Sequence, residues 1–315
     1  NASIVLAIAR LPAAAVALGL AALGNLIQSY NEGVRLVFGA LAAVLWVLLI
    51  LKVIFCWSGV RQNMADAAVA SVTGSTFSMC TMLLAAYAAP WIGGAARVLW
   101  MTGLALNVAF ILWFTVRFTA KRDLSKVFAS YFVAYVGIVV SSLTAPAFGM
   151  AASVGTWAFW FGLACLICLL PIVTYRYIKL PVKADPPKPL FCIYTAPASL
   201  CLAGYIQSVE NKSAALIFAL LALSTVLYLI VLIRLPSFLK LPFYPSYAAF
   251  TFPFVITAIA AKQSMACLAG LGYSVSWLSP VVLIETVIAA VLVIYTLIRY
   301  LMAVGKAVSA PAAAS

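Results

Sequence analysis

Six acidic side chains are the only carboxylate side chains among the 315 residues, and the sequence contains no histidine. These acids are Glu32, Asp66, Asp123, Asp185, Glu210 and Glu285. A Ser/His/Asp triad and a histidine-based metal site are therefore excluded, and no carboxylate pair suited to buried acid–base chemistry can be assembled. We expect no enzyme activity and no bound cofactor.

Glu285 differs from the other acids because it alone lies inside a long apolar segment. An ionisable side chain within a membrane helix is a functional hypothesis by default, so Glu285 is a candidate proton-coupling carboxylate. The alternative is that it lies on an outer helix and pairs with a basic residue or with the lipid headgroup layer. The sequence leaves both interpretations open.

The seven cysteines are scattered singly or lie inside apolar segments, which argues against a disulfide framework. Cys165 and Cys168 have the spacing of half a zinc site, but no second pair and no histidine completes it. We expect the cysteines to be small core residues and the chain to hold no metal.

Membrane helices must position these side chains. Hydrophobic residues make up 67% of the sequence, charged residues 8%, and the mean hydropathy is +1.17, whereas soluble domains contain about 45–50% apolar and about 25% charged residues. Apolar segments near the roughly 20 residues of a spanning helix recur along the chain and predict an all-α integral membrane fold. Ten transmembrane helices are expected, over residues 10–28, 34–55, 75–92, 96–118, 128–149, 154–178, 190–207, 213–235, 244–265 and 279–304.

The loops between these spans are too short for a second domain. We expect residues 1–306 to form one transmembrane channel or transporter domain and 307–315 to form a disordered low-complexity tail. The apolar segment at the start of the chain is interpreted as a first span and not as a removed signal peptide.

Basic residues collect on one side of this topology. If the N-terminus, alternate loops and the C-terminus share one side, only Arg35, Arg97, Lys212 and Lys262 fall on the other. Basic loops stay in the cytoplasm, so both termini are expected there. This distribution also accounts for the net charge of +13, and no nucleic-acid motif is present. Lys262 is either an anion-attracting residue at a pore mouth or a snorkelling lysine.

Consecutive spans alternate in composition. Odd-numbered spans are rich in Ala, Ser, Thr and Gly and carry prolines at Pro12, Pro197, Pro245 and Pro253, whereas even-numbered spans carry Trp, Leu, Ile, Val and Phe. Small residues allow close helix packing, and proline breaks are tolerated where freed carbonyls meet protein or water. The pattern predicts five helical hairpins in a pseudo-five-fold ring, with odd helices inside lining a pore and even helices outside.

Short motifs in three odd-numbered spans resemble a known family. They are Leu18-Gly19-Leu20-Ala21-Ala22-Leu23 in the first, Ala196-Pro197-Ala198 in the seventh, and Thr251-Phe252-Pro253 in the ninth. Together with the helix spacing, they are similar to the tellurite-resistance/dicarboxylate transporter family, which includes bacterial TehA and the plant slow-type guard-cell anion channels. The resemblance covers essentially the whole chain. It implies a homotrimer whose protomers each have a pore closed by a phenylalanine.

That phenylalanine corresponds to Phe252. Pro253, Pro197 and Pro12 are expected to kink the helices near it, and an aromatic ring across a narrow apolar bore blocks ions sterically and by dewetting. Aligning the odd-numbered spans on their small-residue ends puts Phe77 and Phe132 near the level of Phe252 and makes them candidate pore-lining residues. Thr251, Gly19 and Gly137 are further candidates for the pore lining. The fifth span departs from the family because its stretch from Tyr131 to Gly137 lacks the proline that the family often shows there.

The expected function is passive passage of small anions, such as chloride, nitrate or small carboxylates, across a bacterial inner membrane. Selectivity would come from bore size, hydroxyls, backbone dipoles and dehydration cost, because no ring of Lys or Arg appears at mid-span. One alternative is a proton-coupled carrier of dicarboxylate, sulfite or tellurium oxyanions that uses Glu285. The other is a non-conducting membrane sensor or scaffold.

Overall fold

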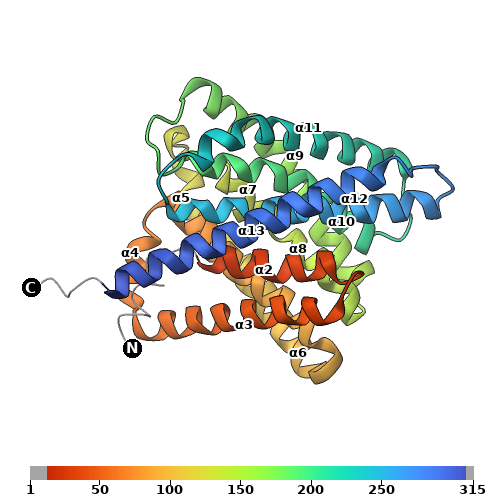
Figure 1. Cartoon of the computed structure of the whole chain (residues 1–315), viewed down its shortest axis with the longest axis horizontal. Helices are drawn as coiled ribbons and strands as arrows, with labels where there is room; N and C mark the ends of the chain where they lie inside the picture. The colour runs from red at the N-terminus through yellow and green to blue at the C-terminus, as the bar shows by residue number, and fades with distance from the viewer. Residues whose placement is uncertain (1–12, 310–315) are drawn as a thin grey trace, which may run out of the picture.

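The structure is a computed structural model that describes residues 13–309, so Pro12 and residues 310–315 lie outside the described residues. Every element in that range is helical (Figure 1). The α-helices are α2 (Ala13–Ile27), α3 (Glu32–Phe55), α4 (Trp57–Asn63), α5 (Ala67–Ala70), α6 (Thr76–Arg117), α7 (Ser130–Val136), α8 (Val139–Thr144), α9 (Thr156–Lys179), α10 (Ala196–Ser208), α11 (Ala214–Leu239), α12 (Phe252–Gly270) and α13 (Leu278–Ser309).

Shorter segments join these helices or precede them. Two are π-helical turns, η1 (Ser71–Ser75) and η5 (Ala151–Gly155). The others are 3₁₀ segments, η2 (Thr119–Lys121), η3 (Leu124–Lys126), η4 (Ala145–Phe148), η6 (Lys188–Thr195) and η7 (Pro245–Phe250). Because η6 and η7 run directly into α10 and α12, each of these helices begins inside the bundle and not at its surface.

Seven helical stretches within the described chain are long and apolar enough to cross a membrane, or eight if the bent α7–α8 pair is counted as one span. This confirms a multi-pass helical fold but not ten helices in a five-fold ring. Two features lower the count. Only the 15 residues of α2 are described for the first expected span, and residues 67–121 count as one continuous stretch.

That long stretch folds back on itself. The backbone leaves helical geometry at Gly93, where φ is 38° and ψ is −102°, three residues after Pro90. Beyond the break, Gly103 lies so close to the first half of α6 that a Cβ there would be 2.9 Å from the Met82 Cγ. Asn107 Nδ2 also donates to Ser78 Oγ at 2.7 Å. The two halves of α6 therefore pack side by side, and the positive φ at Gly93 permits the reversal.

The fifth expected span bends by 53° between α7 and α8, although it contains no proline at that point. Ser75 Oγ donates a hydrogen bond to the Val133 carbonyl at 2.7 Å. A side chain that inserts into a helix in this way supplies a partner for a carbonyl released from the helical ladder. The bend at Gly137 thus has a hydroxyl from a neighbouring helix as its physical cause.

Burial separates inner segments from outer ones. The most apolar windows of Lys188–Ser208 and Pro245–Gly270 are 89% and 67% buried, against 22% for α3 and 33% for the Leu278–Lys306 part of α13. All but two of the residues of α2 are buried as well. Large apolar side chains on the outer helices are exposed, as expected for surfaces that face lipid.

Both ends of the bundle are visible in Figure 1. One end carries α4, α5 and the last turns of α13, and we call it the α4 end. The connection from α2 to α3 and the connection from α12 to α13 lie at the opposite end. The inner segments run between these ends, with the outer helices alongside them.

Candidate functional site

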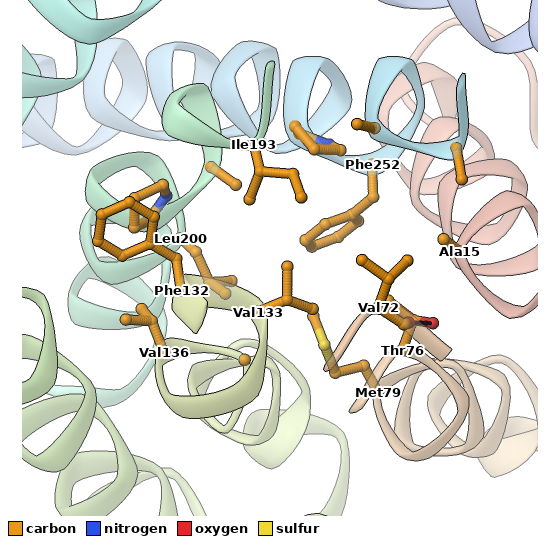
Figure 2. Close-up of a pocket in the computed structure, with 16 residues that line it drawn as sticks. Ala15, Val72, Thr76, Met79, Phe132, Val133, Val136, Ile193, Leu200 and Phe252 are labelled. Carbon is orange, nitrogen blue, oxygen red and sulfur yellow. Dashed lines mark hydrogen bonds between the residues drawn. The ribbon is translucent and has the colours of Figure 1, made fainter. Parts of the chain in front are cut away.

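A small cavity lies in the middle of the bundle, between segments that are far apart in the sequence (Figure 2). Its volume is about 30 Å³, room for no more than about two water molecules. The lining residues come from α2, η1 with α6, α7, η6 with α10, and η7 with α12. They are Ala15, Val72, Thr76, Met79, Phe132, Val133, Val136, Gly137, Ile193, Ala196, Pro197, Leu200, Ala248, Ala249, Phe252 and Pro253.

The Phe252 ring projects into the centre of this cavity, towards Val133, Met79 and Val72 (Figure 2). The side chain is 6% exposed. Phe252 is the first residue of α12, and Pro253 follows it within the first turn. Proline suits that position because its missing N–H would have no partner in the helix. The local sequence therefore starts α12 at the cavity and places an aromatic ring at the start.

Thr251 and Gly19 hold the start of α12 against α2. The Thr251 hydroxyl donates to the carbonyls of Ala248 and Ala15, at 2.7 and 3.1 Å. A Cβ added at Gly19 would come within 2.5 Å of the Thr251 Cβ and within 3.1 Å of the Phe252 nitrogen. Both residues were expected to line a pore, and the structure places both behind the Phe252 ring, outside the cavity lining.

Phe132 and Phe77 have different surroundings. Phe132 lines the cavity at the side of Leu200, and its ring meets that of Tyr194 edge to face at 5.4 Å (Figure 2). Phe77 does not belong to the lining, because its ring stacks on Trp46 of α3 at 6.0 Å. Its neighbour Thr76 faces the cavity instead. Neighbouring helical residues point about 100° apart, so a register shift of one residue separates the expectation from the structure.

The three prolines expected to kink helices near Phe252 are Pro12, Pro197 and Pro253. Pro197 and Pro253 both line the cavity and both lie in the first turn of a helix. Gly137 lines it at the bend between α7 and α8. Pro12 lies outside the described residues, so its place relative to the cavity is not described.

Glu285 does not reach the cavity. It lies on α13, is 4% exposed, and its Oε2 has no hydrogen-bond partner in the described part of the chain. The Tyr228 hydroxyl on α11, within electrostatic range of this carboxylate, also lacks a partner there. Two buried polar atoms therefore remain unsatisfied beside the outer helices.

A larger cavity opens at the α4 end, and we call it the vestibule. It has a volume of about 410 Å³ and shares one lining residue, Val72, with the small cavity. The residues around it are Lys52, Val60, Asn63, Met64, Asp66, Ala68, Val69, Val72, Thr73, Phe128, Pro186, Pro187, Leu190, Pro245 and Ser246. Several of them precede η6, α7 and α12, so the vestibule surrounds the α4 end of the segments that form the small cavity.

The vestibule includes a residue that the sequence analysis treated only as part of the basic side of the protein. Lys52 is buried on the inner face of α3, along with Gly39, Ala42 and Leu49. The spacing of these residues is the signal that identifies it, because intervals of three and seven residues keep side chains on one helix face. Within residues 13–309, no group of three or more His, Cys, Asp or Glu side chains could hold a metal ion.

Comparison with known proteins agrees with this geometry. No curated protein matches the chain. A family model described as voltage-dependent anion channel matches residues 11–301, nearly the whole sequence. The match confirms the resemblance inferred from the motifs. The chain therefore belongs to the voltage-dependent anion channel family, whose members are anion channels and transporters of the membrane and not enzymes.

Proposed function

We propose that this chain forms an anion channel in which each protomer has its own pore and the Phe252 ring closes that pore. The observation that carries the proposal is the ring at the centre of a narrow apolar cavity formed by five separate parts of the chain (Figure 2). An opening with room for about two waters excludes a hydrated ion, and its apolar walls disfavour water. Conduction therefore requires the ring to move.

The proposed pore lies within a topology of ten membrane spans. Counting the two halves of α6 separately, and α2 as a further crossing, adds two crossings to the eight supported by length and composition. Contacts support an inner ring: α2 contacts α6 and α12, α10 contacts α8 and α12, and α7 contacts η1. We place both termini and the α4 end in the cytoplasm, on the positive-inside argument, in a bacterial inner membrane.

Two features favour anions over cations. The helix N-termini of α10 and α12 both lie at the small cavity, at Ala196 and Phe252, and a helix N-terminus carries a partial positive charge. The net charge of +13 also raises the anion concentration near the protein. Chloride, nitrate and small carboxylates are the proposed substrates, selected by dehydration cost and bore size. The homotrimer is carried over from the family resemblance.

A flux assay in proteoliposomes tests this function. Purified wild type and Phe252→Ala are loaded into vesicles, and influx of chloride, nitrate and acetate is measured with and without an imposed pH gradient. We expect Phe252→Ala to pass all three anions down their gradients, with rates that do not depend on the pH gradient. Background flux from folded Phe252→Ala would instead support the non-conducting sensor or scaffold.

The proton-coupled carrier is retained as a second candidate because Glu285 is buried with an unpartnered oxygen. A buried carboxylate of this kind is suited to taking up and releasing a proton. Glu285 does not belong to the cavity lining, and this counts against a direct role for its carboxylate in the pore. Uptake of a dicarboxylate, sulfite or tellurite that requires a pH gradient in wild type and is lost in Glu285→Gln would establish the carrier.

A further inference from the structure

Lys52 is a buried cation that faces a cavity. Its side chain lies in the last turn of α3 with 4% of the residue exposed, whereas the next three residues, Val53, Ile54 and Phe55, are 40%, 63% and 74% exposed. A lysine at the end of a membrane helix usually extends towards water at the lipid surface. Lys52 points the other way, into the vestibule.

No partner neutralises this cation within residues 13–309. The ion pairs there join Arg35 to Glu32, Lys126 to Asp123 and Lys188 to Asp185, and no hydrogen bond from the Lys52 Nζ is found in that range. A lysine ammonium that is largely removed from bulk water gains free energy when a partner of opposite charge joins it, and the vestibule leaves room for one.

Arg176 shows how this protein satisfies a buried cation when no ligand is needed. It is 5% exposed, and its guanidinium donates to the carbonyls of Leu180 and Ser125 at 3.0 and 3.2 Å. It also lies over the Phe128 ring, 4.3 Å from the ring centroid. Lys52 has neither kind of support among the described residues, so its charge is available to a ligand in the vestibule.

The vestibule itself is suited to a small anion. Among the described residues, the other charged residue of the lining is Asp66, whose Oδ1 accepts hydrogen bonds from the backbone nitrogens of Ala68 and Val69 at 2.9 and 3.0 Å. That carboxylate caps α5 and forms no ion pair with Lys52. A volume of about 410 Å³ is many times the roughly 10–15 Å³ that one water needs in a cavity, so an anion can enter with part of its hydration shell.

We propose that Lys52 anchors a binding site for a small anion, an inorganic ion or a short carboxylate, in the vestibule and in series with the Phe252 ring. The inference rests on the proposed channel function, since it makes the vestibule the place where the anion waits before the constriction. Val72, shared by both cavities, marks the point where the bound anion would leave the vestibule. Lys52 sets how well the anion is held there.

Binding is tested first without any transport. The thermal unfolding midpoint of wild type in detergent is measured against nitrate concentration, with gluconate holding the ionic strength constant. A ligand that binds only the folded state raises the midpoint. We expect nitrate to raise it in wild type and in Lys52→Arg but not in Lys52→Met. Lys52→Met should be more stable than wild type without nitrate, because it removes a buried charge. Equal nitrate responses in wild type and Lys52→Met would overturn the site.

The transport arm uses Phe252→Ala as the conducting background. Adding Lys52→Met should raise the half-saturating nitrate concentration roughly tenfold, the factor that corresponds to about 1.4 kcal/mol. Lys126→Gln is the matched control, because Lys126 is exposed, bonded to Asp123, and outside the vestibule lining. An unchanged half-saturating concentration with Lys52→Met overturns the site but leaves the channel intact. Absence of flux in Phe252→Ala itself counts against the channel, while the nitrate-dependent unfolding midpoint still decides whether Lys52 binds.

Discussion

The small cavity and the vestibule share Val72 as a lining residue, yet they differ in volume and in the charge of their walls. The small cavity has a volume of about 30 Å³, apolar walls and an aromatic ring across it, whereas the vestibule has about 410 Å³ and a buried lysine. Apolar walls exclude a hydrated ion, and a buried cation attracts an anion. Under the proposed function, the small cavity decides whether anions pass and the vestibule decides which ions reach it.

The packing of Gly19 against Thr251, behind Phe252, is the feature most sensitive to substitution. Gly19→Ala puts a Cβ where Thr251 already lies, 2.5 Å away, and we expect a loss of about 1–3 kcal/mol in stability from overpacking. Thermal unfolding in detergent measures the loss, and basal anion flux should rise as the start of α12 shifts. Gly59→Ala is the control, because no atom lies within 4 Å of its added Cβ. Equal effects of both substitutions would show that Gly19 does not seat the gate.

The junction of the two cavities is tested at Val72. In the Phe252→Ala background, Val72→Phe should lower nitrate flux about tenfold, since it narrows the passage that truncation opened and so restores about 1.4 kcal/mol of barrier. Val69→Phe is the matched control, because Val69 lines only the vestibule and not the small cavity. Val72→Phe that conducts as well as its background would place the ion path elsewhere.

A substitution at Asp66 tests the charge of the vestibule, with a smaller expected effect. Asparagine can keep the cap of α5 while removing the negative charge. In the Phe252→Ala background, Asp66→Asn should lower the half-saturating nitrate concentration about twofold at low salt, and high salt should screen the effect. Asp123→Asn, an exposed N-cap outside the vestibule, should have no such effect. A rise in the half-saturating concentration would contradict an anion site there.

The smallest effect is expected at Glu285, which belongs to neither cavity. Glu285→Gln should leave nitrate flux in the Phe252→Ala background within about twofold, because its side chain lines neither cavity and shares no partner with Phe252. The assay is repeated with an imposed pH gradient. If the gradient drives uptake in wild type and the substitution abolishes it, proton coupling replaces passive conduction.

Much of the helical arrangement could be predicted from the sequence. Apolar segment lengths and turn residues place most of the helices to within a few residues, although α10 and α12 begin at Ala196 and Phe252 and not at 190 and 244. The gap expected between residues 92 and 96 contains the non-helical Gly93. The bend between α7 and α8 was not predictable from residues 128–149 alone. It depends on Ser75, which approaches the Val133 carbonyl from another helix, and such tertiary hydrogen bonds leave no local signal.

The rotation of each inner helix was the harder part. A helix surrounded by other protein on all sides has no polar face that could orient it, so Phe77 and Thr76 could not be distinguished. In the structure Thr76 lines the small cavity, and the Phe77 ring packs against Trp46. The direction of the Lys52 side chain on the outer helix α3 could not be predicted either. The positive-inside rule explains a lysine at that end of a span whichever way its side chain points.

The most direct test of the gate compares two phenylalanines on α12 in planar bilayers. Phe252 lies in the cavity, whereas Phe254 is fully buried against Tyr228, with ring centroids 5.8 Å apart, and does not line it. Truncating either to alanine removes the same atoms. We predict that Phe252→Ala raises the anion current about tenfold or more over wild type, which corresponds to lowering the free-energy barrier to conduction by about 1.4 kcal/mol. The current through folded Phe254→Ala should stay near that of wild type. Wild-type currents from folded Phe252→Ala, or equal increases in both variants, would contradict Phe252 as the gate.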